Sequence, residues 1–210
     1  GNATRGLGHT ARATHLYHVL VGESPIEAAI LPSGFPFLDL LPADRDLVGV
    51  EVEFVGLERW EEVLGARLAA IAERYDFILI DCPPSLGHLT ILALVAATGV
   101  LIPLQCEYFA LEGVSELLST IRRVTSALNP ELELAGILLT MYDDRMKLTR
   151  DVEREVREHF PAKVFEAVVP RNVRLAEAPS HGLSILHYDI KSRGAEAYLA
   201  VARELLRRSR

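Results

Sequence analysis

A carboxylate stands at the end of a short apolar run, and its position predicts chemistry. Residues 77–80 are all apolar, and Asp81 follows them directly. Four apolar residues suit a strand that is covered on both faces, as in a parallel sheet. Pro83 and Pro84 then prevent continuation as a helix or a central strand. Asp81 is therefore expected at the carboxyl end of a buried strand, the edge where open α/β sheets bind their ligands.

Two roles for Asp81 fit that position. In a nucleotide-binding fold, a carboxylate there faces the Mg²⁺ ion on the phosphates, often through water, because Mg²⁺ keeps much of its hydration. Alternatively, Asp81 only caps the turn that follows. The apolar run and the carboxylate alone leave both roles open, because such runs are common.

Strands and helices alternate along the chain and indicate how that edge is built. Apolar runs predict strands or short extended pieces at 37–41, 77–80, 100–104, 134–140, 164–169 and 185–188. Helical spacing of apolar residues predicts helices over 11–21, 57–74, 89–97, 111–128, 148–160 and 195–208. This alternation favours an α/β fold: a three-layer, doubly wound, mostly parallel sheet with helices on both faces. We expect a single domain over residues 1–210.

The composition restricts the possible partners. The chain has 210 residues, of which 50% are hydrophobic and 24% are charged, and its formal net charge is −7. Any nucleic-acid binding must therefore come from a local basic patch, or from two chains that pool their basic residues. No apolar run approaches the roughly 20 residues of a membrane span. There is no basic-then-apolar leader either, so we expect a cytoplasmic protein.

The opening residues, 1–8, form a glycine-rich loop that no strand precedes. A phosphate-binding loop needs a preceding strand and the lysine of the G-x-x-x-x-G-K-[ST] pattern. That pattern does not occur in the 210 residues.

Several segments at predicted strand ends resemble, in order, those of the ParA/Soj chromosome-partitioning ATPases. They are ILIDCPPSLG at 78–87, QCEYFALEG at 105–113, LTMYD at 139–143 and, most specifically, PRNVRLAEAPSHG at 170–182. The resemblance implies a P-loop NTPase-like fold. In that family, a deviant phosphate-binding loop and two strands precede the position of Gly1, so roughly the first forty residues of the pattern are missing. We therefore expect residues 1–210 alone to be inactive as an ATPase.

The resemblance also implies ATP and Mg²⁺ as cofactors. Asp81 would orient the ion during phosphoryl transfer to water. Pro83 would belong to a stiff switch loop, for which a plain tight turn is the alternative. Met141, Pro170 and Asn172 would form the adenine pocket, with two apolar contacts and one amide that offers a donor and an acceptor. Alternatively, Met141 fills the core and Asn172 is a turn residue.

DNA binding without sequence preference, by a homodimer that forms when ATP binds, is a further implication. Basic residues in loops or at the starts of elements would contact phosphates. They are Arg145, Lys147, Arg171, Arg174 and Arg193. The alternative for each is an ion pair with a nearby carboxylate. A ParB-type partner would stimulate hydrolysis, and the cytoplasmic protein would associate with the nucleoid.

Two other functions stay open at this point. A related MinD-type membrane cycle requires an amphipathic tail beyond the last helix, and residues 205–210 have no apolar face to spare. We therefore expect no membrane partner. The second alternative is an interaction module without catalytic activity and without a phosphate-binding loop.

Overall fold

The computed structural model describes residues 1–10, 14–108 and 110–209. These residues form two compact units. Unit 1 comprises Gly1–Ala97 and Pro179–Gly182, and unit 2 comprises Thr98–Ala178 and Leu183–Arg210. Each unit has hydrophobic clusters of its own. The expectation of a single domain stays a prediction.

Unit 2 is built on two parallel strands, β3 (Gly99–Gln105) and β4 (Glu133–Thr140). Their register pairs Ile102 with Ile137. The helix α7 (Ala110–Ala127) connects them, as a parallel crossover requires. The sequence predictions at 100–104, 111–128 and 134–140 are therefore confirmed.

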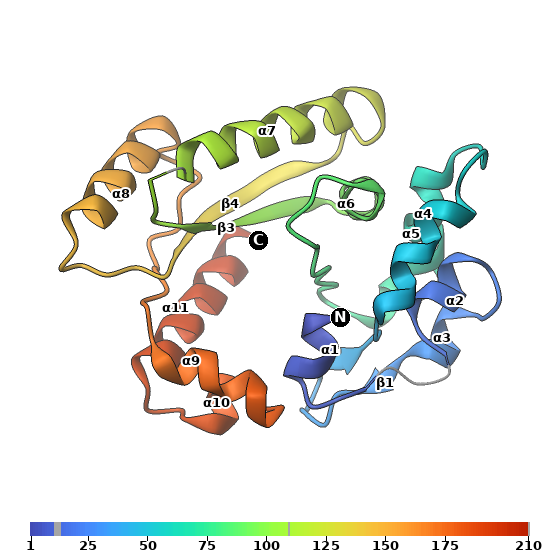
Figure 1. The fold of residues 1–210 in the computed structure, drawn as a ribbon, viewed down its shortest axis with the longest axis horizontal. Helices are drawn as coiled ribbons and strands as arrows, with labels where there is room; N and C mark the ends of the chain where they lie inside the picture. Colours follow the sequence, from blue (N-terminus) through green and yellow to red (C-terminus); the bar gives the residue numbers. More distant parts are fainter. Residues whose placement is uncertain (11–13, 109, 210) are drawn as a thin grey trace. The chain divides into compact units, whose positions relative to one another are not determined.

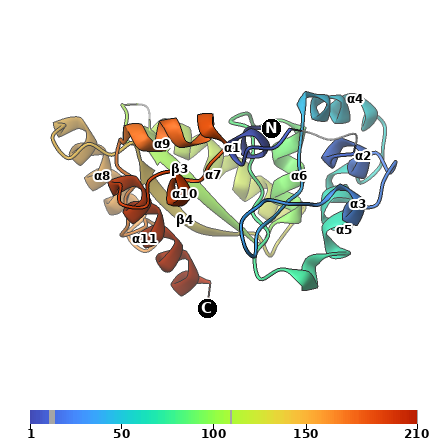
Figure 2. The ribbon, with the colours of Figure 1, turned by 90° about the horizontal axis from the view of Figure 1, so that it is seen from below.

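Helices cover both faces of these two strands. Figure 1 shows α7 and α8 (Lys147–His159) on one side of the strands and α11 (Arg193–Arg208) on the other, and Figure 2 shows the same elements from below. On the α11 side, Val201 packs against Leu138 and Phe165. Coverage of both faces explains why β4 is an almost continuous apolar run.

The segment 164–169 was predicted to be a strand, and the structure forms only its two ends. Val164 bridges to Ile137 of β4, and Pro170 forms the second bridge just past the segment. The backbone N–H groups of Phe165 and Val169 donate to Ile137 and Leu139 of β4 at 2.8 and 2.9 Å. Between them, the N–H groups of Glu166 and Ala167 both donate to the carboxylate of Glu204 at 2.9 Å. A buried side chain thus takes the hydrogen bonds that a strand ladder would use.

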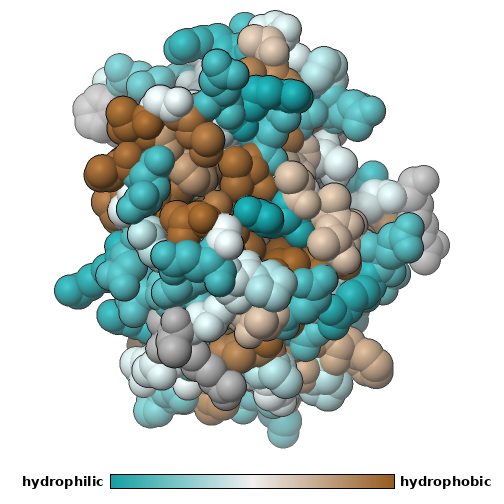
Figure 3. Space-filling model, turned by 90° about the vertical axis from the view of Figure 1, so that its right-hand side faces the viewer, coloured by the Kyte–Doolittle hydropathy of each residue, from teal (hydrophilic) through white to brown (hydrophobic). Residues whose placement is uncertain are grey.

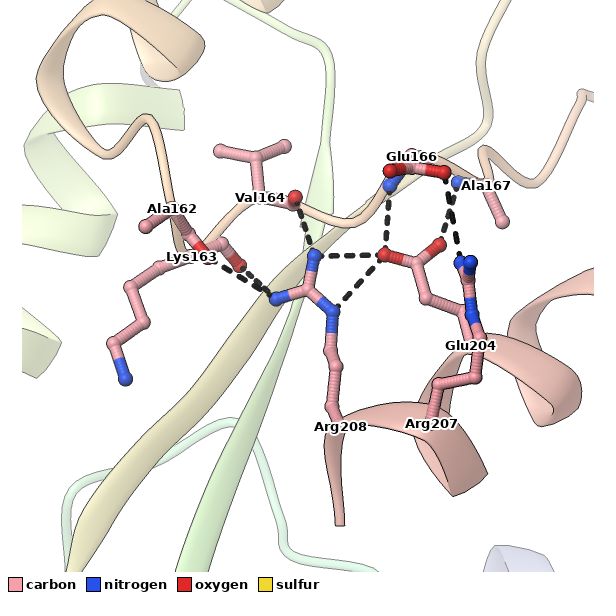
Figure 4. A network of polar contacts seen from close by, with 8 residues as sticks. All are labelled: Ala162, Lys163, Val164, Glu166, Ala167, Glu204, Arg207 and Arg208. Carbon is pink, nitrogen blue, oxygen red and sulfur yellow. Dashed lines mark hydrogen bonds and ion pairs between the residues drawn. The ribbon is translucent and has the colours of Figure 1, made fainter. Parts of the chain in front are cut away.

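The Glu204 carboxylate is held in turn by Arg208, one turn further along α11 (Figure 4). The Nη2 of Arg208 donates to Glu204 at 2.7 Å and to the carbonyl of Val164 at 2.8 Å. Its guanidinium also lies 4.3 Å from the ring centroid of Phe165. The two side chains therefore satisfy backbone groups that pair with no further strand among the described residues.

The remaining elements of this region are short helices. They are α9 (Val173–Glu177), η4 (Ala178–His181) and α10 (Ile185–Tyr188). The prediction of an extended piece at 185–188 is wrong. Ile185 and Tyr188 both contact the cluster around Ala195, and a spacing of three residues reaches one side only in a helix.

Unit 1 consists mainly of short helices around two apolar clusters. Its elements are α1 (Asn2–Gly6), α2 (Leu16–Leu20), α3 (Ile26–Ala29), β1 (Leu31–Pro32), β2 (Asp39–Leu40), η1 (Arg45–Gly49), α4 (Val50–Glu53), η2 (Trp60–Glu62), α5 (Val63–Ala69), η3 (Ala72–Arg74) and α6 (His88–Ala96). The predicted helix 11–21 appears as α2, and its residues 11–13 lie outside the described ranges. The predicted strand 37–41 appears as β2, paired with β1 in an antiparallel hairpin.

The predicted helix 57–74 is broken into η2, α5 and η3. Its apolar stripe serves two different clusters, because Leu64 packs with Val50 and Phe54, whereas Ile71 packs with Val19 and Ile26. One straight helix could not pack against both clusters.

The predicted strand at 77–80 is not formed. Phe77 is 46% exposed and Leu79 is 81% exposed. Among the described residues, no strand pairs with this segment, and a lone extended segment has no ladder to hold it. Within the same ranges, no helix is long and apolar enough to cross a membrane.

Candidate functional site

Adjacent chain segments of unit 2 bring together the residues predicted to hold a base. The backbone N–H of Arg171 donates to the carbonyl of Tyr142 at 3.0 Å, and Tyr142 forms a parallel bridge with Pro170. The bridge lies just past the end of β4. Met141 and Pro170 therefore stand at neighbouring strand ends, and Asn172 follows two residues later.

Met141 has a left-handed backbone conformation, with φ of +52°. A side chain in this region costs roughly 1–2 kcal/mol relative to the right-handed one. Its side chain is 40% exposed, so core packing does not explain why this conformation is kept. Strained residues of this kind gather at functional sites, where the surrounding structure holds them. The suggestion that Met141 is only core filler does not fit this exposure.

Asn172 is the N-cap of α9. Its Oδ1 accepts a hydrogen bond from the backbone N–H of Arg174 at 2.8 Å. The cap occupies the acceptor side of the amide. In the part of the chain that the structure describes, no hydrogen bond uses the NH₂ group, which has two N–H donors. Asn172 is thus a turn residue, as the alternative held, and it retains the donors that a base contact needs.

A polar cluster fixes Tyr142 between these residues and α8. Its hydroxyl donates to Glu153, and Arg157 Nε donates to the same carboxylate at 2.9 Å. The hydrogen bond to Glu153, together with burial, raises the pKa of Tyr142 to about 12. Burial and the charge of Glu153 raise the pKa of the nearby Cys106 thiol to about 11. Both groups therefore stay protonated, and the Tyr142 hydroxyl ties the chain just past β4 to Glu153 of α8.

Asp81 and Pro83 belong to unit 1, where they lie in an exposed segment without regular secondary structure. Within the described ranges, no hydrogen bond or ion pair engages the Asp81 carboxylate. Burial raises the pKa of the Cys82 thiol, and the negative charge of Asp81 raises it further. The switch-loop role of Pro83 and the metal role of Asp81 both stay predictions.

The donor chemistry of Asp81 is compatible with Mg²⁺. Carboxylate oxygen is a ligand that Mg²⁺ prefers, and the ion typically takes one or two carboxylates together with water and substrate phosphates. Among the described residues, no group of three His, Cys, Asp or Glu side chains could hold a metal ion. The described residues therefore form no cluster of side chains for a resident metal ion. A Mg²⁺ ion that is bound to a nucleotide needs only a single carboxylate from the protein.

Asp143 interacts electrostatically with two of the arginines that were predicted to contact DNA. Arg145 donates to its carboxylate at 2.9 and 2.7 Å, a bidentate pair. These hydrogen bonds, with a smaller contribution from the positive charge of Arg171, lower the pKa of Asp143 to about 2. Arg145 is thus ion-paired, as the alternative reading proposed, while its side chain remains 85% exposed. Lys147 follows as the exposed first residue of α8.

Arg174 and Arg193 lie where α9 meets the start of α11. Gly194 approaches Leu175 so closely that an added Cβ would lie 2.6 Å from the leucine side chain. The two arginines precede these contact residues in the sequence. Arg174 also donates to Glu177 at 3.0 Å and pairs with Asp189 at 3.6 Å.

Sequence reasoning missed three residues that organise this region: Tyr142, Glu153 and Asp189. The spacing of Glu153 and Arg157 on one helix face was a usable signal, because residues four apart are neighbours. No local pattern indicates that Asp189 reaches Arg174.

Comparison with known proteins adds an independent set of observations. A family model described as an AAA domain matches residues 1–134. The chain is 50% identical over 214 residues to the chromosome partitioning protein ParA of Caulobacter vibrioides, covering 100% of this chain and 80% of that protein. It is 48% identical over 207 residues to the sporulation initiation inhibitor protein Soj of Bacillus subtilis, covering 98% of this chain and 82% of that protein.

A solved structure gives the corresponding match in three dimensions. The crystal structure of cobyrinic acid a,c-diamide synthase from Mycobacterium smegmatis with bound ADP and magnesium superposes with a TM-score of 0.80 and 36% sequence identity. The match covers 96% of this chain and 75% of that chain. It confirms the predicted α/β fold class.

Proposed function

The chain belongs to the ParA/Soj family of chromosome-partitioning ATPases, and on that premise we propose that it binds and hydrolyses ATP in a cycle that positions replicated DNA. The observation that carries the proposal is the 50% identity to a chromosome partitioning protein along the whole of this chain. Most of the residues proposed below stand at strand ends or helix starts of unit 2.

We assign a metal-binding role to Asp81 of unit 1. Asp81 would hold Mg²⁺, directly or through water, and the ion would neutralise charge on the phosphate oxygens. Pro83 would keep the following segment stiff. Support comes from the carboxylate chemistry of Asp81 and from the matched structure, which contains bound ADP and magnesium. The prediction that residues 1–210 alone are inactive stays a prediction, which ATP hydrolysis by that purified polypeptide would check.

Met141, Pro170 and Asn172 of unit 2 are our candidates for contacts with the base. The two apolar side chains would contact the faces of adenine, and the free NH₂ group of Asn172 would donate to a ring nitrogen. The bridge between Tyr142 and Pro170 supports this arrangement, because it holds both strand ends at one edge.

DNA is the partner that we propose for the basic residues of unit 2. Arg145, Lys147, Arg171, Arg174 and Arg193 would contact phosphates without reading sequence. Because the chain has a net charge of −7, one copy provides a weak patch, and a homodimer formed on ATP binding would double it. A ParB-type protein would trigger hydrolysis and release. This chain, rather than its partner, would be cytoplasmic and associated with the nucleoid.

Retention of double-stranded DNA by the full-length protein, with and without ATP, tests this function. We expect retention only with ATP, a steep loss of affinity with salt, and weaker retention by Lys147→Ala and Arg171→Ala. Glu131→Ala is a matched control on an exposed loop. Retention by anionic vesicles but not by DNA would instead favour the MinD-type membrane cycle. Equal retention with and without ATP would contradict the proposed switch.

A further inference from the structure

Met141 is held from both sides along the chain. Thr140, which precedes it, pairs with Gln105 of β3 in the last step of the parallel ladder. Tyr142, which follows it, donates its backbone N–H to the carbonyl of Val169 at 3.0 Å. The left-handed conformation of Met141, with φ of +52°, therefore lies between two fixed neighbours. Such a conformation persists only where the surrounding structure determines it.

Tyr142 is connected to both halves of the group proposed to contact the base. It directly follows Met141, and its backbone carbonyl accepts a hydrogen bond from the N–H of Arg171 at 3.0 Å. It also forms the parallel bridge with Pro170, two residues before Asn172. A displacement of Tyr142 would therefore move the apolar contact and the amide relative to each other.

The side chain of Tyr142 is fixed by a carboxylate on α8. Its hydroxyl donates to Glu153, and the same carboxylate accepts a hydrogen bond from Arg157 Nε at 2.9 Å. Val152 and Val156 of α8 are 5% and 0% exposed, so the helix that carries Glu153 is itself anchored. Burial alone raises the pKa of Glu153, but the hydrogen bonds from Tyr142 and Arg157 outweigh this and lower it. The acceptor is therefore ionised at neutral pH, and hydrogen bonds to ionised groups are short and strong.

A buried thiol lies beside this hydrogen bond. Cys106 follows β3 and is 5% exposed, and burial together with the charge of Glu153 raises the pKa of its thiol to about 11. The Glu153 side chain is itself only 24% exposed. A hydrogen bond in such surroundings is electrostatically stronger than one in water. The bond to Glu153 therefore restrains Tyr142 more firmly than an exposed pair would.

We propose that Tyr142 and Glu153 are positioning residues that set the base selectivity of the nucleotide site. Their hydrogen bond keeps Met141 in the conformation that presents its side chain to adenine, and through the bridge it keeps Pro170 and Asn172 in register with that contact. Neither positioning residue touches the nucleotide. The inference rests on the proposed function, because it requires that Met141 and Asn172 contact the base. It adds that α8 takes part in the choice of nucleotide.

Calorimetric titration of the full-length protein with three probes in the presence of Mg²⁺ tests the proposal. The probes are ATP, GTP and inorganic tripolyphosphate, which has the phosphates but no base. Tyr142→Phe removes the hydrogen-bond donor, and Glu153→Leu removes the acceptor. We expect each to weaken ATP binding by about three- to tenfold, to lower the preference for ATP over GTP, and to leave tripolyphosphate binding unchanged.

Two further variants show whether the hydrogen bond itself is responsible. Glu153→Gln keeps an acceptor oxygen and should retain most of the ATP affinity. A double variant with Tyr142→Phe and Glu153→Leu should bind ATP no more weakly than either single variant, because all three lose the same bond.

Unit 1, where Figure 3 shows apolar side chains gathered among polar ones, contains the matched control. The hydroxyl of Tyr75 donates to the Asp39 carboxylate at 2.7 Å, which is the same pairing of groups at an exposed position. Tyr75→Phe should leave the affinities for all three probes near their wild-type values.

The three probes separate a positioning role from the alternatives. An equal loss of affinity for ATP and for tripolyphosphate would overturn the proposal, because a merely structural role affects every ligand alike. Unchanged ATP affinity in Tyr142→Phe would also overturn it, and would leave the proposed base contacts of Met141 and Asn172 standing. If the wild-type protein bound ATP no more tightly than tripolyphosphate, those base contacts would be wrong, and the positioning role with them.

Discussion

The side chain of Asn172 accepts a hydrogen bond from the backbone N–H of Arg174, so a residue proposed to contact the base also starts the helix α9. The two roles use different atoms of one amide, and they can be separated by mutation. Asn172→Ala removes both the cap and the NH₂ donors, whereas Asn172→Asp retains an oxygen that can cap.

We expect Asn172→Ala to lower the free energy of unfolding by about 1 kcal/mol, and Asn172→Asp to leave it nearly unchanged. Both variants should bind ATP more weakly and discriminate less between ATP and GTP. Urea unfolding and nucleotide titration of the full-length protein measure the two effects. Wild-type ATP affinity in Asn172→Asp would refute the base contact and leave the cap intact.

The left-handed backbone of Met141 gives a second prediction. Met141→Gly and Met141→Ala both remove the side chain, but only glycine adopts φ of +52° without cost. Met141→Gly should therefore be more stable than Met141→Ala by about 1 kcal/mol. Nucleotide affinity should fall equally in both, because both lose the apolar contact with the base. If the affinity of either variant matched wild type, Met141 would have no place in the pocket.

The sequence predicted the sheet of unit 2 well where neighbours in sequence are also neighbours in space. The strands β3 and β4 and the helices α7, α8 and α11 begin and end within two residues of the prediction. Their apolar periodicity is strong because each packs along most of its length. The short segment at 185–188 had too few residues for a period to be decisive.

The predictions are wrong where a residue that is distant in the sequence determines the local structure. Nothing within 164–169 indicates that Glu204 will take two of its N–H groups, and nothing within 77–80 indicates whether a partner strand is present. The candidate site shows the same contrast between residues indicated by local sequence and contacts that depend on distant residues. The ends of the predicted strands indicated Met141 and Asn172 as candidates. The pairing of Arg174 with Asp189, in contrast, depends on how α9 meets α10. The pairs Asp143–Arg145 and Glu153–Arg157 could have been predicted from local spacing.

Asp143 restrains the basic patch, which leads to a third prediction. Its pKa of about 2 keeps it ionised at any pH used for binding, with Arg145 hydrogen-bonded to it. Asp143→Asn removes that charge, which frees Arg145 from its bidentate ion pair and takes away a negative charge that acts on Arg171. DNA affinity with ATP should rise by roughly three- to tenfold at low salt, and the salt dependence should become steeper.

Asp151→Asn is the control for that experiment, because Asp151 pairs with Arg154 on α8 and not with the proposed DNA contacts. It should leave DNA affinity near the wild-type value. Filter binding at several salt concentrations measures both variants. An unchanged or lower affinity for Asp143→Asn would contradict a role for Arg145 and Arg171 in phosphate binding.

The buried carboxylate of Glu204 makes the stability of unit 2 depend on acid. Burial alone raises its pKa, but hydrogen bonds from the backbone of Ala167 and Glu166 and from Arg208 outweigh this and bring it below the ordinary value of 4.5. A carboxyl group whose folded pKa is lowered stabilises the fold above its unfolded pKa, and this stabilisation is lost as the pH falls through the folded value. Acid destabilisation from Glu204 should therefore begin below about pH 4.5.

Glu204→Gln should abolish this part of the pH dependence and lower the free energy of unfolding at neutral pH by about 3 kcal/mol, since Arg208 loses its charged partner in a buried site. Urea unfolding between about pH 3 and 7 measures both effects. Glu166→Gln is the control, because its ion pair with Arg207 is exposed and should contribute well under 1 kcal/mol. If Glu204→Gln kept the wild-type slope of stability against pH below 4.5, another carboxylate would be responsible for the acid response.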